Sequence, residues 1–223
     1  DLRYDNINMH WIQRHILDQL MTHATRRFSE LRAEGVESNL FQYHLRHIIR
    51  KGLVEKCDKG YRLAPQGLYY ADRYSREYKG ERPQPKLITV IVLKNNRGEV
   101  LLQQKSRQPW IGQYHLPAGK IHIGEATLAA AVRELKEKTG IDGVCSLQFS
   151  SSAHVQVMQE GTVISDYFGL IYSGNYDGPV ERGEWIDLDR CPDGLVLAPS
   201  VRELLCVARG HDGGVHSVVV EVE

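Results

Sequence analysis

Residues 119–141 read GKIHIGEATLAAAVRELKEKTGI, a glycine-bearing loop followed by a segment with helical periodicity. Apolar residues recur there every three or four positions, which predicts an amphipathic helix over residues 125–139. Its apolar face consists of Leu128, Ala131, Val132 and Leu135. Glu134 and Glu137 are three positions apart, so the helix places their carboxylates next to each other on its surface.

Two adjacent carboxylates repel each other unless a proton or a cation lies between them. Hard divalent cations such as Mg²⁺ take one or two protein carboxylates and complete their shell with water and substrate phosphates. A metal ion bound in this way can activate water and neutralise phosphate charge. The pair Glu134 and Glu137 therefore indicates metal-dependent phosphate chemistry.

The same stretch resembles the Nudix box, G-x5-E-x7-R-E-U-x-E-E-x-G-U, in which U is a bulky aliphatic residue. The positions that match in register are Gly119, Glu125, Arg133, Glu134, Leu135, Glu137, Gly140 and Ile141. Residues 116–120, 185–189 and 199–205 also resemble the family's lead into the box, its late tryptophan strand and its closing helix. The resemblance implies an α/β fold over residues 86–210, the Nudix α/β/α sandwich with a mixed sheet.

The resemblance also implies an activity, hydrolysis of a nucleoside diphosphate linked to another group, with Mg²⁺ or Mn²⁺ as cofactor. The substrate would be a nucleoside triphosphate, a dinucleotide or a nucleotide sugar. Glu134 and Glu137 match catalytic, metal-binding positions, Arg133 matches the arginine that orients them, and the Gly119 carbonyl matches a further metal contact. Lys120 and Lys138 are the candidates for contacts to the substrate.

Lys138 departs from the pattern, because the box has a metal-binding glutamate at that position. One interpretation is a helix surface of ion pairs, Glu134 with Lys138 and Arg133 with Glu137, that binds no metal. The other is that Lys138 contacts a phosphate and a remote carboxylate supplies the missing ligand. The candidates for that carboxylate are Glu160, Asp166, Glu181 and Glu184. Substrate contacts or structural roles are both open for His115, His122, His154, Trp110, Tyr114 and Phe168.

The remaining elements of this half follow from apolar runs separated by turn residues. We expect strands at 87–93, 100–104, 144–158, 163–173 and 185–188, and a closing helix at 200–208. The tail, residues 211–223, contains the run VVVEV at 218–222, which predicts an added edge strand.

The first 80 residues show a different pattern. Helical periodicity predicts helices at 10–23, 28–33 and 39–51, the third with Ser38 as its N-cap, and a fourth from Pro65 to about Tyr78. Two short strands, 53–56 and 61–63, form a hairpin between the third and fourth helices. Residues 38–54 resemble the recognition helix and strand entry of winged-helix regulators, and residues 61–67 resemble their wing exit. The resemblance implies a small winged helix-turn-helix domain over residues 1–80, joined by a proline-containing linker at 81–85.

A recognition helix of this kind fits the DNA major groove. The resemblance makes Asn39, Gln42, Tyr43 and Arg46 the candidate readers of double-stranded DNA, and Lys59 a wing contact to phosphate. Residues 1–80 hold 14 Lys and Arg against 10 Asp and Glu, whereas the rest of the chain holds 14 against 18. The alternative is that the module mediates dimerisation or gates the substrate, with these charges solvated.

Two functions therefore remain open. The first is a Nudix hydrolase with a winged helix that localises or regulates it. The second is a transcription regulator, in which a weakened Nudix-like domain senses a nucleotide and a homodimer binds an operator. Bacterial regulators of NAD metabolism combine the same modules, but with the Nudix part first. The four cysteines are scattered and no apolar run approaches the ~18 residues of a membrane span, so we expect a cytoplasmic protein that does not contact a membrane.

Overall fold

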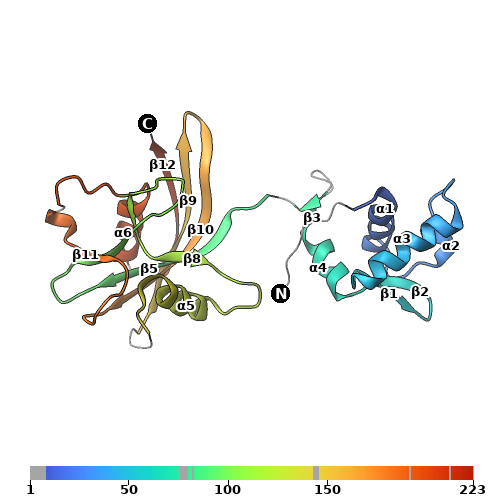
Figure 1. Cartoon of the computed structure of the whole chain (residues 1–223), viewed down its shortest axis with the longest axis horizontal. Coiled ribbons are helices and arrows are strands. Elements are labelled where there is room, and N and C mark those ends of the chain that lie inside the picture. Colours follow the sequence, from blue (N-terminus) through green and yellow to red (C-terminus); the bar gives the residue numbers. More distant parts are fainter. Residues whose placement is uncertain are drawn as a thin grey trace. The chain divides into compact units, whose positions relative to one another are not determined.

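The computed structural model describes residues 9–75, 80–81, 83–142, 146–190, 192–210 and 212–222. The chain forms two compact units, Asp1–Pro83 and Gln84–Glu223 (Figure 1). Within the described ranges, no helix has both the length and the apolar character needed to cross a membrane. Cys57 and Cys206 are free thiols, and the other two cysteines lie outside the described residues.

The first unit contains four helices and a hairpin among its described residues. The helices are α1 (Trp11–Met21), α2 (Phe28–Leu31), α3 (Ser38–Arg50) and α4 (Pro65–Arg73). The antiparallel strands β1 (Val54–Cys57) and β2 (Gly60–Leu63) lie between α3 and α4, and β3 (Tyr74–Ser75) pairs with β4 (Gly80–Glu81). One core holds this unit together, because the apolar stripes of α1 and α3 meet in a single buried cluster.

Two boundaries in this unit differ from the sequence-based expectation. Ser38 is the first residue of α3 rather than its N-cap, and Glu37 takes the cap position without a side-chain hydrogen bond. The helix α4 ends at Arg73, because Tyr74 is extended and begins β3. The expected end at Tyr78 lies outside the described residues.

The second unit is built on a mixed sheet. Its strands are β5 (Lys86–Lys94), β6 (Val100–Gln104), β7 (Tyr114–His115), β8 (Ala118–Lys120), β9 (Gln148–Gln159), β10 (Thr162–Asn175), β11 (Glu184–Ile186) and β12 (Val215–Val222). The order is β11-β6-β5-β10-β9-β12, with β7 paired to β6 and β8 paired to β5. The pairs β5–β10 and β9–β12 are parallel, and the others are antiparallel.

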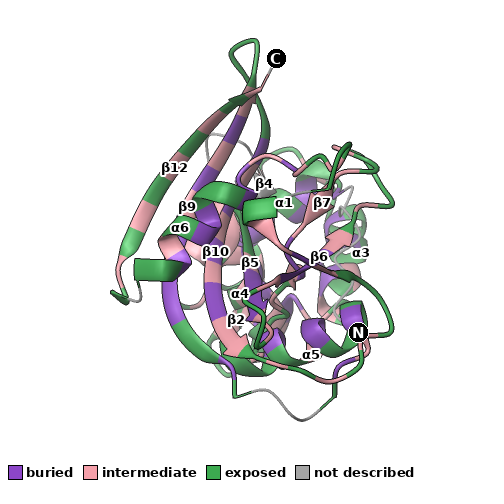
Figure 2. Ribbon diagram, turned by 90° about the vertical axis from the view of Figure 1, so that its left-hand side faces the viewer, coloured by how far each residue is buried: buried purple, intermediate pink, exposed green. Residues whose placement is uncertain are grey.

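The helices α5 (Thr127–Thr139) and α6 (Val201–Gly210) cover opposite faces of this sheet. Ile91 of β5 packs with α5, whereas the neighbouring Val90 and Val92 pack with α6, because successive strand residues point to opposite faces. Buried residues run through the middle of β9 and β10 (Figure 2). By contrast, β12 carries only half-buried and exposed residues and forms the edge of the sheet.

Some boundaries in the second unit also differ from expectation. Ala126 is extended, so α5 begins at Thr127 and Glu125 lies in the preceding loop. The strand predicted at 185–188 covers Glu184–Ile186, and Leu188–Arg190 form a short 3₁₀ helix. The start of the strand predicted at 144–158 lies outside the described residues, and β9 begins at Gln148.

Candidate active site

The helix α5 is fixed at both ends, which sets the position of its carboxylates. The Thr127 hydroxyl bonds to the hydroxyl of Tyr172 on β10 at 2.7 Å. At the other end, Gly140 adopts a left-handed conformation with φ 78° and donates its N–H to the carbonyl of Lys136. A residue with a Cβ tolerates that conformation poorly, so the glycine ends the helix cleanly.

Glu134 lies between α5 and the backbone of β8. Glu134 is only 6% exposed. Its carboxylate fills the space that a Cβ at position 119 would occupy, so a larger residue there would displace the carboxylate. The glycine of the motif therefore has a packing reason: it brings the β8 backbone into contact with a helix carboxylate.

Arg133 connects the acidic residues of the motif. Its Nε and Nη2 donate to the two oxygens of Glu125 at 2.7 and 2.9 Å. Its Nη1 donates to Glu134 at 2.7 Å and to Glu137 at 3.4 Å, and Nη2 also donates to the carbonyl of Lys120 at 3.0 Å. One guanidinium thus joins the loop, the helix and the strand β8.

These contacts fix the charges of Arg133 and Glu125. The hydrogen bonds from Arg133, and then the backbone N–H of His122, lower the pKa of Glu125 to about 2. In return, the hydrogen bonds to Glu125 and Glu134 raise the pKa of Arg133. Glu125 and Arg133 are therefore ionised at neutral pH. With Glu134 and Glu137 counted as carboxylates, three formal negative charges face one positive charge, so the cluster attracts cations.

The donor set fits a divalent ion that relies on few protein ligands. Among the described residues, no group of three or more His, Cys, Asp and Glu side chains has the arrangement of a metal site. Glu134, Glu137 and the Gly119 carbonyl remain, and Mg²⁺ commonly takes one or two carboxylates and leaves its other positions to water and phosphates. Glu137 is 56% exposed at its side chain and accessible to such an ion.

Comparison with known proteins decides the family of the second unit. The NUDIX domain family matches residues 84–196, about half of the chain. The chain belongs to the Nudix family. The second unit, with the mixed sheet, is accordingly its Nudix domain.

Relatives of the Nudix domain differ in their chemistry. The chain is 29% identical over 119 residues to the NAD-capped RNA hydrolase NudC of Vibrio atlanticus (strain LGP32), covering 52% of this chain and 43% of the relative. It is 32% identical over 121 residues to the oxidized purine nucleoside triphosphate hydrolase of Danio rerio (52% and 75%). It is 30% identical over 123 residues to the isopentenyl-diphosphate Delta-isomerase of Serratia proteamaculans (strain 568) (49% and 65%). The chain thus spans less than half of the first of these relatives.

Among solved structures, the Nudix domain of Shewanella oneidensis NrtR, in complex with ADP ribose, aligns with a TM-score of 0.48 and 20% identity. The alignment covers 64% of this chain and 96% of that structure.

Lys138 of the Nudix domain does not form the ion pair that its spacing suggests. Glu134 is bonded to Arg133 instead, at 2.7 Å. The second ion pair of the interpretation in which the helix surface binds no metal, Arg133 with Glu137, is present at 3.4 Å. Lys138 is exposed, and its backbone carbonyl accepts a hydrogen bond from Gln103 at 2.6 Å. Its side chain is therefore accessible to a ligand.

The four remote carboxylates are distributed over the domain. Glu181 lies at the C-terminal end of α5, where its N–H donates to the Thr139 carbonyl at 3.0 Å and its carboxylate lies beside Gly140. Glu184 accepts from the Tyr114 hydroxyl at 3.1 Å, and Asp166 pairs with His154 at 2.8 Å. Glu160 lies in the turn between β9 and β10. None of them joins Glu134 and Glu137 in a metal-binding group of described residues.

Glu125 was not among the site residues that the sequence analysis assigned, although it matches a fixed position of the motif. The structure makes it the residue that anchors Arg133 through two hydrogen bonds. Its position six residues after Gly119, where the motif has a fixed glutamate, could have identified it. The contact itself crosses the loop-to-helix boundary, where helical spacing does not apply.

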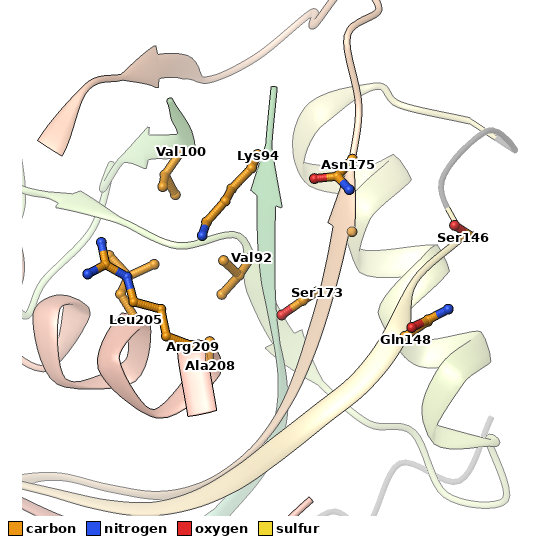
Figure 3. Close-up of a pocket in the computed structure, with 11 residues that line it drawn as sticks. Val92, Lys94, Val100, Ser146, Gln148, Ser173, Asn175, Leu205, Ala208 and Arg209 are labelled. Atoms are coloured by element: carbon orange, nitrogen blue, oxygen red, sulfur yellow. The ribbon is translucent and has the colours of Figure 1, made fainter. Parts of the chain in front are cut away.

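Two cavities open on the α6 face of the sheet. The first has a volume of about 380 Å³ and lies near the C-terminal end of α6, where the side chains of Lys94 and Arg209 extend into the same space (Figure 3). The second, of about 160 Å³, adjoins the N-terminal end of α6 and is lined by two of the predicted contact residues, Trp110 and His115. Ala118, the neighbour of Gly119 on β8, also lines it.

In the first unit, the predicted DNA-contacting residues share one surface. Asn39, Gln42, Tyr43 and Arg46 are exposed on α3, and together with Ile49 and Arg50 they line a shallow groove. The opposite side of α3 is buried against the unit's core. Lys59 is exposed in the turn between β1 and β2.

Proposed function

We propose that the Nudix domain hydrolyses a phosphoanhydride bond in a diphosphate-linked nucleotide with the help of Mg²⁺ or Mn²⁺. The observation that carries this proposal is Glu134, which is buried against Gly119 and held by Arg133 at 2.7 Å. Holding a charged group in one orientation before the substrate arrives is the main way in which enzymes stabilise charge in phosphoryl transfer.

Each residue of the cluster has a part in this reaction. Glu134, Glu137 and the Gly119 carbonyl would hold the divalent ion, which supplies activation of water and neutralisation of phosphate charge. Glu125 holds Arg133, and Arg133 orients Glu134 and Glu137. The exposed ammonium groups of Lys120 and Lys138 bind the diphosphate oxygens.

A hydrolysis screen tests this function. The wild type is incubated with nucleoside triphosphates, dinucleotides and nucleotide sugars, in Mg²⁺ or Mn²⁺, beside Glu134→Gln and Glu137→Gln. Asp142→Asn is the matched control, since Asp142 is an exposed carboxylate that follows the same helix and pairs only with Lys136 among described residues. We expect Glu134→Gln to lower kcat about 10²–10⁴-fold and Asp142→Asn to leave it unchanged. A folded wild type that cleaves no member of the panel would contradict the proposal.

The first unit supports a second function, that of a transcription regulator. We propose that it is a winged helix-turn-helix domain that binds double-stranded DNA, and that the Nudix domain then senses a nucleotide. The observation in favour is the surface of α3, where amide and guanidinium side chains are exposed together on the face opposite the core. A homodimer would present two such helices to a site with two-fold symmetry.

Selection from random DNA duplexes tests this second function, and anisotropy titrations follow with single variants. Arg46→Met should relax base preference at one position by about 1–3 kcal/mol. Lys59→Met should weaken binding to all sequences. It should also lower the slope of the logarithm of the binding constant against the logarithm of the salt concentration by about 1. Arg14→Met, an exposed position on α1, is the control. If selection enriches no sequence, the regulator function is wrong.

A further inference from the structure

The cavity at the N-terminal end of α6 has an unusual charge composition. Its lining includes two lysines, Lys86 and Lys105, and among the described residues that line it there is no Asp or Glu. Neither lysine forms an ion pair with a carboxylate of the described part of the chain. Like charges that share a cavity without a counter-ion repel each other, so the cavity favours an anionic guest.

The two lysines make contacts with the cavity wall, although Lys86 is exposed and Lys105 is half-buried. The Nζ of Lys86 donates to the hydroxyl of the buried Ser165 at 3.1 Å. Lys105 lies over the ring of Trp110 at 5.9 Å, and burial together with the charge of Lys86 lowers its pKa. Lys105 has thus lost part of its hydration without gaining a carboxylate, and such a cation binds an oxyanion more strongly than a fully solvated lysine does.

His115 does not supply a third positive charge. Burial, and then the charge of Lys105, lowers its pKa to about 4. Its Nδ1 is within 2.7 Å of the Leu116 carbonyl, so in the neutral ring this nitrogen carries the proton and donates it. At neutral pH the cationic character of the cavity therefore comes from the two lysines alone among its described lining residues.

The backbone around the cavity is strained. Three non-glycine residues of the described chain have positive φ, and two of them, Trp110 (64°) and Ser200 (75°), line this cavity. Such conformations cost about 1–3 kcal/mol each and concentrate at ligand-binding sites. The Lys94 and Arg209 cavity lacks this feature, and Arg209 lies in the last turn of α6, where a cation is stabilised by the helix dipole.

The cavity and the Nudix box adjoin through β8. Ala118 lines the cavity, Gly119 touches Glu134, and the Lys120 carbonyl accepts from Arg133. These three consecutive residues span about 7 Å at 3.3 Å per strand residue. Among the described strands, β8 pairs with β5 alone. Ala118 faces the α6 side of the sheet and Gly119 the α5 side, so one ligand reaches both places by passing around the edge of β8 that no described strand covers.

We propose that this cavity is a subsite for an oxyanion, a phosphate or carboxylate group, held by Lys86 and Lys105. The Nudix domain then selects diphosphate-linked substrates that carry a further anionic group beyond the diphosphate. The substrate selection depends on the proposed hydrolysis, whereas the anion binding does not.

Binding of inorganic phosphate to the full chain in EDTA, followed by calorimetry, tests the subsite without catalysis. We expect saturable binding by the wild type, and binding about tenfold weaker or more in Lys105→Met and Lys86→Met, because each loses a charge-assisted hydrogen bond. Lys105→Arg keeps the charge and should retain binding. Lys94→Met is the matched control, a lysine on the same strand and face as Lys86 that lines the other cavity.

Unchanged phosphate binding in Lys86→Met and Lys105→Met, or equal loss in Lys94→Met, would overturn the subsite. For the substrate class, KM is compared between a dinucleotide and the same dinucleotide with an added ribose phosphate. We expect Lys105→Met to raise KM about tenfold for the phosphorylated member only. An equal effect on both would overturn the substrate selection. Absence of hydrolysis with intact phosphate binding would contradict the proposed hydrolysis and leave the subsite established.

Discussion

An alanine at position 119 would place its methyl group in the space that the Glu134 carboxylate occupies. Gly119 is not among the glycines with positive φ, so the substitution Gly119→Ala leaves the backbone relaxed and confines the clash to one side chain. The carboxylate has to move, and it then gives up its 2.7 Å bond to Arg133. A hydrogen bond to a charged group contributes about 1.5–3 kcal/mol, so we expect the free energy of unfolding to fall by about 2 kcal/mol.

The same substitution should raise the free energy of unfolding, rather than lower it, once Glu134 is absent. In the background Glu134→Ala the methyl group meets no carboxylate. Replacing glycine by alanine at a compatible position then stabilises by about 0.4–1 kcal/mol, because the unfolded chain loses freedom. A double-mutant cycle should therefore show a coupling between positions 119 and 134 of about 2–3 kcal/mol.

Urea denaturation followed by tryptophan fluorescence measures this coupling. Trp11 belongs to the first unit, whereas Trp110 and Trp185 belong to the Nudix domain. The wild type, the two single variants and the double variant all carry Trp11→Phe. The tryptophan fluorescence then reports the Nudix domain alone, and two domains are not treated as one transition. If Gly119→Ala costs the same free energy with and without Glu134, the packing argument is refuted.

Three further predictions concern stability. His115 takes up a proton near pH 6.5 in the unfolded chain but only near pH 4 in the folded one. Its contribution to the free energy of unfolding is therefore complete above pH 6.5 and is lost as the pH falls to 4, a loss of about 3 kcal/mol. Denaturation measured across this range should show that loss in the wild type and not in His115→Gln. Gly67→Ala should destabilise the first unit by about 1–3 kcal/mol, because the new methyl overlaps the carbonyl of Leu53, and circular dichroism melting of the variant would show it. Glu160→Asn should raise the free energy of unfolding by up to about 1 kcal/mol in urea titrations, since residues 160 and 161 have φ values of 47° and 73° and Asn-Gly is the favoured pair for such a hairpin turn.

The parts of the site that depend on helix geometry could be predicted from the sequence. The spacing of Glu134 and Glu137 and the i,i+4 relation of Arg133 to Glu137 need only the helical repeat, and the Arg133–Glu137 contact is present. The pair of Glu134 with Lys138, which one of the two interpretations required, is absent, although the same repeat allows it. Arg133 competes successfully for Glu134, because Glu125 already fixes its guanidinium in place.

Features that depend on pairing between distant segments could not be predicted. Periodicity alone suggested that α4 continues to Tyr78, but Tyr74 is extended and pairs with Glu81 across a short ladder. Likewise, Lys86 and Lys105 belong to separate strand ends, and only the packed sheet brings them to one cavity. No local pattern in residues 86–105 encodes that proximity.

The lysine at position 138 changes the charge of the site in which hydrolysis is proposed. Glu125, Glu134 and Glu137 against Arg133 leave a formal charge of −2 before Lys120 and Lys138 are counted, and a lysine at position 138 makes the site two charges less negative than a glutamate would. A site with less negative charge attracts a free divalent ion less strongly and repels a diphosphate less strongly. Since Mg²⁺ keeps several waters and binds through one or two carboxylates together with substrate phosphates, the lower charge would favour joint binding of ion and nucleotide in the proposed reaction. In the proposed hydrolysis the exposed Lys138 ammonium would contact the phosphates, so the residue that departs from the motif would favour binding of the ion together with the nucleotide.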